Sequence, residues 1–346
     1  MRNDKMNQRL RTAILGCGGF AHRHAHTLEL LSDDFEMVAF CNRTLEKAVA
    51  FSEKYTHGQA PVFSDQHEMF NTVPLDVVII CLPPYAHSDE VDLAASRGVH
   101  VFIEKPIALY SEQGWRMVEA AENAGIVTQV GFMFRFGEAI EHLKEMIDSG
   151  KAGPAGLMSA RYFCNSLHSP WWRKQELSGG QLVEQVIHMV DLMRFLMGEA
   201  STAYSRQENI FHREVEDYTV EDVSATIFGF PQGATGVIYA TNGAIPDRWI
   251  NDYRVVSRNL TAEFTDANHA TFHHTSTPDR PPEMIASERD VYLAEMQDFL
   301  TAIRSGRPTR TPLREGAKSL DLALAATQSA QIGSEVHLSE TRPRVT

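Results

Sequence analysis

Apolar and polar positions alternate in two different ways along the chain, and the change comes near residue 131. Before it, short apolar runs rich in β-branched residues are separated by mixed segments long enough for helices. Strands joined by crossover helices form parallel sheets that are covered on both faces. We therefore predict a doubly wound α/β domain. Its expected strands lie within 12–19, 37–42, 76–84, 99–106 and 126–132, and its expected helices within 22–34, 45–55, 88–98 and 111–125.

After residue 131 the apolar runs follow one another without regular crossover helices, which is typical of an antiparallel sheet. We expect strands within 157–165, 224–230, 233–241, 252–266 and 269–276. Helical periodicity is expected within 136–154, 291–306 and 314–335. The chain is thus predicted to form an α/β domain over 1–131 and an α+β domain over 132–346. We expect the last helix, about 313–333, to pack back on the first domain.

Composition narrows the class of protein. A chain of 346 residues is long enough for two hydrophobic cores. Its net charge of -13 and the lack of a basic stripe argue against nucleic acid as a partner. No apolar run reaches the roughly 18 residues that cross a bilayer, and the first ten residues lack the apolar segment of a secretory signal. We expect a cytoplasmic protein with no membrane partner and four structural cysteines, Cys17, Cys41, Cys81 and Cys164.

A glycine-rich turn follows the first expected strand. Gly16, Gly18 and Ala21 give the spacing G-x-G-x-x-A, with Gly19 and Phe20 inside it. Glycine permits a tight turn and close backbone approach, and the N-terminus of the next helix presents N–H groups to a pyrophosphate. The position between a strand and a helix favours a dinucleotide site.

The second expected strand ends at Asn42 and Arg43, where an acidic residue would select NAD through the ribose 2′-hydroxyl. Asn42 carries no charge to repel a 2′-phosphate, and Arg43 can pair with one. We therefore predict NADP or NAD as cofactor, with NADP slightly favoured. The alternative is a solvated arginine without a role in binding.

The segment 179–191 places Glu184, His188 and Asp191 among apolar residues. At about 100° per residue the three fall on one face of a helix, where they could bind a metal, relay a proton or cap a buried pocket. Three histidines at 22, 24 and 26 also invite a metal interpretation. Alternating positions do not share a helix face, so we predict no metal there.

Strand ends carry further motifs. Glu104, Lys105 and Pro106 close one strand of the first domain, "CLPPYAH" follows another, and "VGFMFRF" comes at 130–136. With the glycine turn and the segment 179–191, these motifs make nearly the whole chain resemble the glucose–fructose oxidoreductase, inositol dehydrogenase and MocA family of nicotinamide-dependent oxidoreductases. The resemblance implies a Rossmann dinucleotide-binding domain, followed by an α+β domain with a large open, mostly antiparallel sheet. It also implies a homo-oligomer, a dimer or tetramer, formed through that sheet.

The family pattern D-x-G-x-H-x-x-D is matched by His188 and Asp191, whereas Glu184 replaces Asp and Val186 replaces Gly. By resemblance, the expected cofactor contacts beyond the glycine turn are Cys81, Pro83, Pro84, His87, Glu104 and Lys105.

The resemblance also implies hydride transfer between a secondary hydroxyl of a sugar, polyol or cyclitol and the nicotinamide. Oxidation of such a hydroxyl removes a hydride from its carbon and a proton from its oxygen. Histidine titrates near neutral pH, so His188 suits the proton transfer. Lys105 suits stabilisation of a developing alkoxide, and Glu184 would orient His188 or bind a hydroxyl. We place Asp191 in support, holding the imidazole or an arginine such as Arg194.

The segment 162–180 indicates the substrate class. Aromatic faces pack against the C–H surfaces of sugars, and polar side chains read hydroxyl groups. A carbohydrate or cyclitol is therefore expected, and an acidic sugar would suit two of the arginines. The candidate substrate residues are Arg135, Tyr162, His168, Trp171, Trp172, Arg173, Glu184 and His188.

Three other functions remain open at this point. One is a redox-neutral glycosidase or lyase that retains NAD(H) and oxidises a sugar hydroxyl transiently. Another is a cofactor-sensing protein without turnover, against which the presence of Lys105 and His188 argues. The last is a metal-dependent hydrolase that uses Glu184, His188 and Asp191.

Overall fold

The computed structural model describes residues 8–338. The amino-terminal segment, on which the argument against a secretory signal depends, lies partly outside them, as do the last eight residues of the predicted second domain. Two compact units are present. Among the described residues, one comprises 8–108, 112–131 and 292–317, and the other 109–111, 132–291 and 318–338. The units differ from the predicted domain ranges mainly in that 292–317 joins the first.

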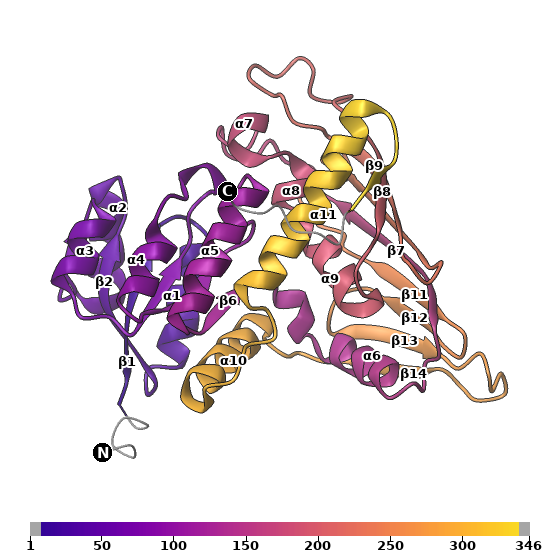
Figure 1. The fold of residues 1–346 in the computed structure, drawn as a ribbon, viewed down its shortest axis with the longest axis horizontal. Coiled ribbons are helices and arrows are strands. Elements are labelled where there is room, and N and C mark those ends of the chain that lie inside the picture. Colours follow the sequence, from indigo (N-terminus) through magenta and orange to yellow (C-terminus); the bar gives the residue numbers. More distant parts are fainter. Residues whose placement is uncertain (1–7, 339–346) are drawn as a thin grey trace. The chain divides into compact units, whose positions relative to one another are not determined.

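The first unit contains a six-stranded parallel sheet with the order β3-β2-β1-β4-β5-β6 (Figure 1). Its strands are β1 (Leu10–Leu15), β2 (Phe35–Cys41), β3 (Val62–Phe63), β4 (Val77–Ile80), β5 (His100–Ile103) and β6 (Thr128–Val130). Its helices are α1 (Ala21–Leu30), α2 (Leu45–Thr56), α3 (Gln66–Thr72), α4 (Glu90–Ser96), α5 (Ser111–Ala124) and α10 (Val291–Ser305), with a short 3₁₀ turn η2 (Pro84–Ala86). The predicted doubly wound fold is confirmed; the short edge strand β3 has no counterpart in the sequence prediction.

Helices cover both faces of this sheet. Buried residues of α1, α2 and α10 form one core with Ile14, Phe40, Ile79 and Phe102 of the strands. Figure 1 shows α3, α4 and α5 together on the other face. Because both faces are covered, all four residues of Val77–Ile80 are buried, which explains the continuous apolar run in the sequence.

The second unit contains a nine-stranded mixed sheet with the order β14-β13-β12-β11-β7-β10-β9-β8-β15. Its strands are β7 (Ala155–Phe163), β8 (Thr202–Glu208), β9 (Val223–Gly229), β10 (Thr235–Thr241), β11 (Tyr253–Ser257), β12 (Thr261–Phe264), β13 (His269–His273), β14 (Glu283–Ala286) and β15 (Val336–His337). β7 and β10 pair in parallel and the other neighbours pair antiparallel. The mostly antiparallel sheet is thus confirmed.

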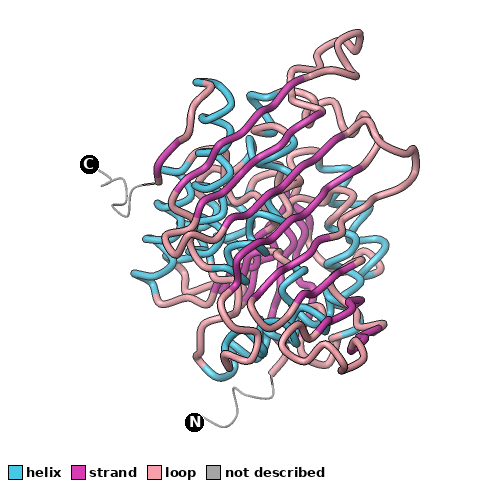
Figure 2. Tube along the Cα trace, turned by 90° about the vertical axis from the view of Figure 1, so that its right-hand side faces the viewer, coloured by secondary structure: helices cyan, strands magenta, loops and turns pink. Residues whose placement is uncertain are grey.

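One face of this sheet is packed and the other is open. Its remaining elements are η3 (Met133–Phe136), α6 (Glu138–Asp148), α7 (Gln175–Ser178), α8 (Gln181–Glu184), α9 (Ile187–Met197) and α11 (Leu313–Ile332), which begins in the first unit. Residues of α6, α9 and α11 join the inward side chains of the strands in one core. Figure 2 views the sheet from its uncovered side, with the strands running side by side.

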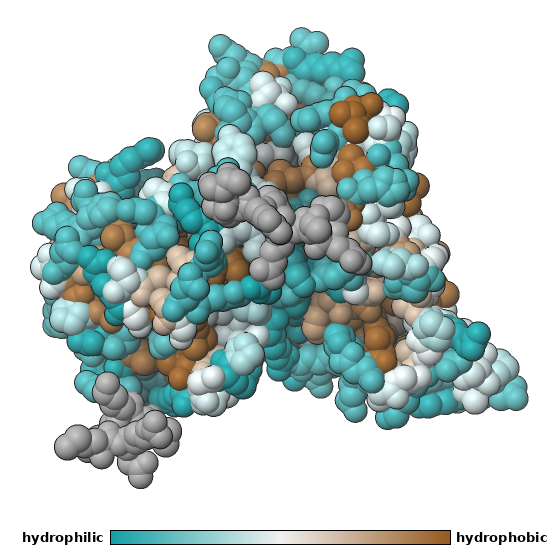
Figure 3. Space-filling model, in the orientation of Figure 1, coloured by the Kyte–Doolittle hydropathy of each residue, from teal (hydrophilic) through white to brown (hydrophobic). Residues whose placement is uncertain are grey.

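The outer face of the sheet carries exposed apolar side chains, which alternate with the buried ones along each strand. They include Leu157, Tyr204, Ile227, Tyr239 and Val256. The view in Figure 3 shows a different, mainly hydrophilic surface with small hydrophobic areas. None of the helices within 8–338 combines the length and apolarity required to span a membrane.

Candidate active site

The glycine turn lies where the order of the parallel strands reverses, because β1 pairs with both β2 and β4. Ligands of open α/β sheets bind at the carboxyl ends of strands at such a point. Gly16 has a φ of +95°, and a Cβ there would approach the carbonyl oxygen of Cys81 to 2.4 Å. In contrast, a Cβ at Gly18 or Gly19 would meet nothing within 4 Å. The turn is therefore tight against β4 and open on its other side.

Helix α1 starts directly after this open turn. No side chain caps its N-terminus at Phe20, and its first turn contains no acidic residue. Uncapped N–H groups together with the helix dipole favour an anion such as a pyrophosphate. The Phe20 ring is half exposed and lies edge-on to Tyr292, with 5.9 Å between the ring centroids. The turn and the helix start together fit the diphosphate of a dinucleotide.

Asn42 braces the same turn from the end of β2. Its Oδ1 accepts the backbone N–H of Cys17 at 3.0 Å, and its Nδ2 donates to the carbonyl of Thr44 at 2.9 Å. The next residue, Arg43, is exposed. Asn42 thus has a structural partner that the sequence did not reveal, while the prediction that this pair reads the ribose stays a prediction.

The turn after β4 carries Cys81, Pro83, Pro84 and His87. Burial raises the pKa of the Cys81 thiol well above its usual range, which disfavours a reactive thiolate. Pro84 is buried and begins the 3₁₀ turn η2. The loop therefore keeps its shape through packing and proline geometry.

His87 leads into a buried acid–imidazole pair. Its Nδ1 lies 2.6 Å from Oε1 of Glu90, and both side chains are fully buried. Burial raises the pKa of Glu90, whereas hydrogen bonds from His87 and from the backbone N–H of Ser88 lower it, and the net shift is downward. Because the carboxylate can only accept, Nδ1 carries the proton. Nε2 of His87 is buried and has no hydrogen-bond partner among the described residues. Its lone pair fits a donor such as a ribose hydroxyl.

Glu104 and Lys105 follow β5 at the same edge of the sheet. Oε1 of Glu104 lies 2.7 Å from Nε2 of His24 on α1. Oε2 accepts the backbone N–H of Lys105 at 3.2 Å. The Glu104 carboxylate thus binds the peptide N–H of Lys105.

In the second unit, the prediction of one helix through Glu184, His188 and Asp191 is wrong. The segment forms two helices, α8 and α9, separated at Gln185 and Val186. The carbonyl of Gln181 accepts the N–H groups of both Gln185 and Val186, at 2.9 and 3.0 Å. The hydrogen-bond ladder therefore skips one step, and Glu184 and His188 do not share the face of a regular helix.

His188 lies in the first turn of α9 in aromatic surroundings, with its ring centroid 5.3 Å from that of Phe134 and 6.2 Å from that of Phe132. Three residues further on, Asp191 accepts a two-pronged bond from Arg135, at 2.7 and 2.6 Å. Asp191 also accepts from the hydroxyl of Ser319 at 3.0 Å. The partner of Asp191 is thus chiefly Arg135, whereas Arg194 lies 3.9 Å away.

Arg135 was predicted to recognise an acidic substrate, but its environment indicates a different role. Its side chain is buried, paired with Asp191 and placed over the ring of Phe195 at 4.7 Å. A guanidinium already engaged bidentately has little capacity left for a second carboxylate. We interpret Arg135 as part of the internal support of α9 and do not carry it forward as a substrate ligand.

A cleft of about 610 Å³ brings together several predicted substrate residues within the second unit. Trp172 donates its indole N–H to Oε2 of Glu184 at 2.7 Å. The ring of His168 lies 4.3 Å from that of Trp172. Burial lowers the pKa of His168, against the opposing effect of its bond to Asn242, and so favours the neutral ring. The lining residues are Ser166, Leu167, His168, Ser169, Trp171, Trp172, Glu184 and Gln185.

Two other predicted substrate residues have structural contacts instead. Tyr162 is buried in the core of the second unit. Arg173 donates to the carbonyls of Leu167 and His168 at 2.8 and 3.2 Å, so it shapes the cleft loop. Sequence reasoning missed Trp249, which is 53% exposed and has its ring 5.7 Å from that of His168. Its position in the loop between two expected strands was the available signal.

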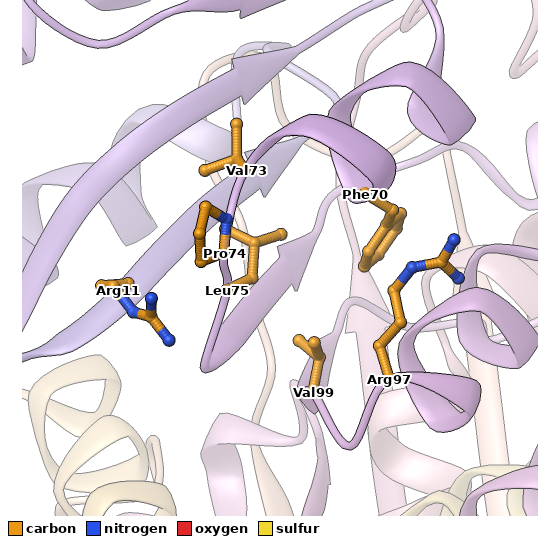
Figure 4. Close-up of a pocket in the computed structure, with 7 residues that line it drawn as sticks. All are labelled: Arg11, Phe70, Val73, Pro74, Leu75, Arg97 and Val99. Atoms are coloured by element: carbon orange, nitrogen blue, oxygen red, sulfur yellow. The ribbon is translucent and has the colours of Figure 1, made fainter.

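Another cavity, of about 280 Å³, lies at the amino ends of the parallel strands (Figure 4). Arg11 and Arg97 lie on opposite sides of it, with apolar side chains between them. Arg11 is bound by the carboxylate of Asp76 at 2.9 and 3.0 Å. This cavity contains none of the predicted catalytic residues, and ligands of such sheets bind at the opposite edge.

Comparison with known proteins agrees with the division of the chain into two units. Residues 10–132 match the oxidoreductase family with an NAD-binding Rossmann fold, and residues 140–261 match the C-terminal domain of the same GFO/IDH/MocA family. The chain belongs to the GFO/IDH/MocA family. The family resemblance inferred from the motifs is thus confirmed, and the first unit is its NAD-binding Rossmann domain.

Similar proteins cover nearly the whole chain. A scyllo-inositol 2-dehydrogenase (NAD(+)) of Bacillus subtilis is 26% identical, over 97% of this chain and 98% of its own length. A D-glucoside 3-dehydrogenase of Escherichia coli is 27% identical, over 98% of this chain and all of its own length. A levoglucosan dehydrogenase, solved in complex with NADH and levoglucosan, shares the fold with a TM-score of 0.87 at 20% identity, covering 95% of this chain and 99% of that one.

Proposed function

We propose that this member of the GFO/IDH/MocA family is an NAD(P)-dependent dehydrogenase acting on a secondary hydroxyl of a carbohydrate or cyclitol. The observation that carries the proposal is the set of groups at one edge of the parallel sheet. The open glycine turn, the acceptor Nε2 of His87 and Lys105 all follow carboxyl ends of its strands. The inositol and glucoside dehydrogenases similar to this chain support the substrate class.

The first unit would hold the cofactor through its own backbone. Uncapped N–H groups of α1 bind the diphosphate, and Nε2 of His87 accepts a bond from a ribose hydroxyl. When bound, the nicotinamide supplies the hydride acceptor. Arg43, exposed beside the uncharged Asn42, favours NADP slightly over NAD, because it can pair with a 2′-phosphate.

Two residues are proposed for the charge and proton changes at the substrate oxygen. Lys105, as an ammonium, donates a hydrogen bond to that oxygen and stabilises the alkoxide as it develops. His188 takes the hydroxyl proton, a task suited to a group that titrates near neutral pH. Glu184 completes the candidate set by binding a substrate hydroxyl, since it lines the aromatic cleft.

The cleft of the second unit supports a sugar or cyclitol as substrate. Trp171 and Trp172 offer aromatic faces for C–H surfaces, and His168, Gln185 and Glu184 offer polar groups for hydroxyls. A cavity lined by apolar faces and a few polar groups is typical of small-molecule sites. We further propose that the chain forms a homo-oligomer through the open face of its nine-stranded sheet, where apolar side chains are exposed.

Absorbance of the reduced nicotinamide tests the proposal. Purified protein is mixed with aldoses, inositols, uronates and glycosides, with NAD⁺ and NADP⁺ in parallel. We expect turnover that falls about 100- to 1,000-fold in Lys105→Ala, because the alkoxide loses its charged donor. Lys151→Ala, at an exposed lysine of the second unit, is the matched control and should retain wild-type turnover.

Two results would contradict the mechanism or the reaction class. Normal turnover by Lys105→Ala would remove the proposed role of that lysine. Sugar products formed without net reduction of the cofactor would instead favour the redox-neutral glycosidase or lyase with retained NAD(H). The same mixtures should therefore be analysed for sugar products by mass spectrometry.

A further inference from the structure

A buried contact joins the helix after the glycine turn to the segment after β5 that carries Lys105. His24 lies in the first two turns of α1, and Glu104 is the first residue after β5. Nε2 of the imidazole is 2.7 Å from Oε1 of the carboxylate, and the two residues are 1% and 7% exposed. Since a carboxylate oxygen only accepts, the imidazole donates this bond.

The surroundings hold both groups in place. The His24 ring lies edge-on to Phe20, at 5.5 Å, and to Phe102, at 4.8 Å. On the other side, a Cβ at Gly131 would come within 2.7 Å of the Glu104 carboxylate, so glycine leaves the space that this carboxylate occupies. Three elements, α1, β5 and the end of β6, therefore fix one carboxylate orientation.

The same carboxylate reaches the main chain of Lys105. While Oε1 binds His24, Oε2 accepts the Lys105 N–H at 3.2 Å. A hydrogen-bonded path thus leads from α1, which starts at the glycine turn, to the peptide group from which the Lys105 side chain departs. Buried charged groups with all partners in place rigidify their surroundings, and loss of one partner leaves the other strongly destabilised.

We propose that His24 and Glu104 form a positioning dyad, which fixes the backbone of Lys105 relative to the glycine turn. Neither residue touches the reacting atoms through this contact. They act on Lys105, so the inference rests on the role proposed for that lysine. Supporting residues behind reactive groups typically contribute 10- to 100-fold to activity in metal sites, and we expect an effect of that size here.

Three variants separate positioning from folding and cofactor binding. His24→Leu removes the donor while keeping an apolar side chain between the two rings. His24→Gln retains an N–H donor at a similar reach. His26→Leu is the matched control, because His26 lies on the same helix with its side chain 57% exposed. Each variant is compared by thermal unfolding, by fluorescence titration with reduced nicotinamide dinucleotide and by steady-state kinetics.

A direct observation of Lys105 makes the test independent of turnover. Reductive ¹³C-methylation labels the lysines while preserving their charge, and the Lys105 signal is assigned by its loss in Lys105→Arg. We expect this signal to move in His24→Leu and to stay in place in His24→Gln and His26→Leu. Glu104→Gln, which keeps an acceptor for His24 but removes the charge, should also move it.

In kinetics, His24→Leu should lose 10- to 100-fold in kcat, with KM and the cofactor dissociation constant changed less than about threefold. His24→Gln should recover most of the loss. An unmoved Lys105 signal in folded His24→Leu would overturn the proposal, as would cofactor affinity that falls in proportion to kcat. If His24→Leu does not fold, Glu104→Gln decides by the same signal. If the wild type reduces no cofactor, the proposed function fails, while the Lys105 signal still decides whether the dyad exists.

Discussion

The two sheets of this protein place their functional groups in different ways. In the parallel sheet both faces are covered, and the candidate groups lie at strand ends, where the main chain of Gly16 forms the turn and the Glu104 carboxylate binds the peptide group of Lys105. In the nine-stranded sheet one face is covered, and the candidate groups lie on α8, α9 and a long loop above it. Their positions depend on side-chain contacts between segments far apart in the sequence. The first site is therefore sensitive to backbone changes, and the second to the loss of a partner side chain.

Among the predictions, loss of one partner of the buried ion pair in the second unit should have the largest energetic effect, a decrease in the free energy of unfolding. Asp191→Asn removes the negative charge of the carboxylate to which Arg135 donates two hydrogen bonds. Breaking a buried ion pair from one side typically costs 3–5 kcal/mol, because the remaining charge stays buried. We expect a loss of about that size in the free energy of unfolding, measured in urea. The exposed pair Arg254–Glu263 provides the control, since Arg254→Gln should cost less than about 1 kcal/mol. Equal losses in both variants would show that burial does not distinguish the pairs.

The second largest effect is expected from a change of backbone geometry at the glycine turn of the first unit, which should lower cofactor affinity. Gly16→Ala places a Cβ 2.4 Å from a backbone oxygen at a φ of +95°, so the turn must shift. We expect cofactor affinity to fall about 100-fold, a change of about 2.7 kcal/mol, measured by fluorescence titration. Thermal unfolding of Gly18→Ala provides the control for the fold, because its Cβ meets no neighbouring atom. Wild-type affinity in Gly16→Ala would show that the turn is not the diphosphate site.

The open face of the second sheet should be the most tolerant of change within the monomer. Ile227 is exposed there, in the middle of β9, whereas its neighbour Phe228 is buried. Ile227→Lys should alter the free energy of unfolding by less than about 1 kcal/mol, because the Ile227 side chain is exposed and its replacement removes nothing from the core. It should nevertheless convert the proposed oligomer to monomer in light scattering. A wild-type protein that is itself monomeric would refute the proposed interface.

The elements of the fold that could be predicted from the sequence are those marked by local patterns of residues. Continuous apolar runs and strand-end motifs in the first unit are local signals, so the strands and the glycine turn were found from the sequence. The strands β9 and β10 were also found, because each forms a short apolar run, while the open face of their sheet was expected only from the family resemblance. The short strand β3 was missed because two residues carry no periodicity.

Contacts between distant segments set the limit of prediction at the candidate site. The His87–Glu90 pair has a spacing of three residues, which the sequence displays, but its importance appears only when burial is known. Arg135 looked like a substrate ligand because its partner Asp191 lies 56 residues away. The division between α8 and α9 was also invisible, since helical spacing alone assumes an unbroken ladder.

The order of segments along the chain has a consequence for synthesis on the ribosome. Met296, Phe299 and Leu300 of α10 complete the core of the first unit, although its six strands all end by residue 130. At roughly 5–20 residues per second, these residues emerge some 8–35 s after the sixth strand. Throughout that interval the nascent sheet lacks one of its covering helices. A gene truncated after residue 131 would leave the same apolar surface uncovered permanently.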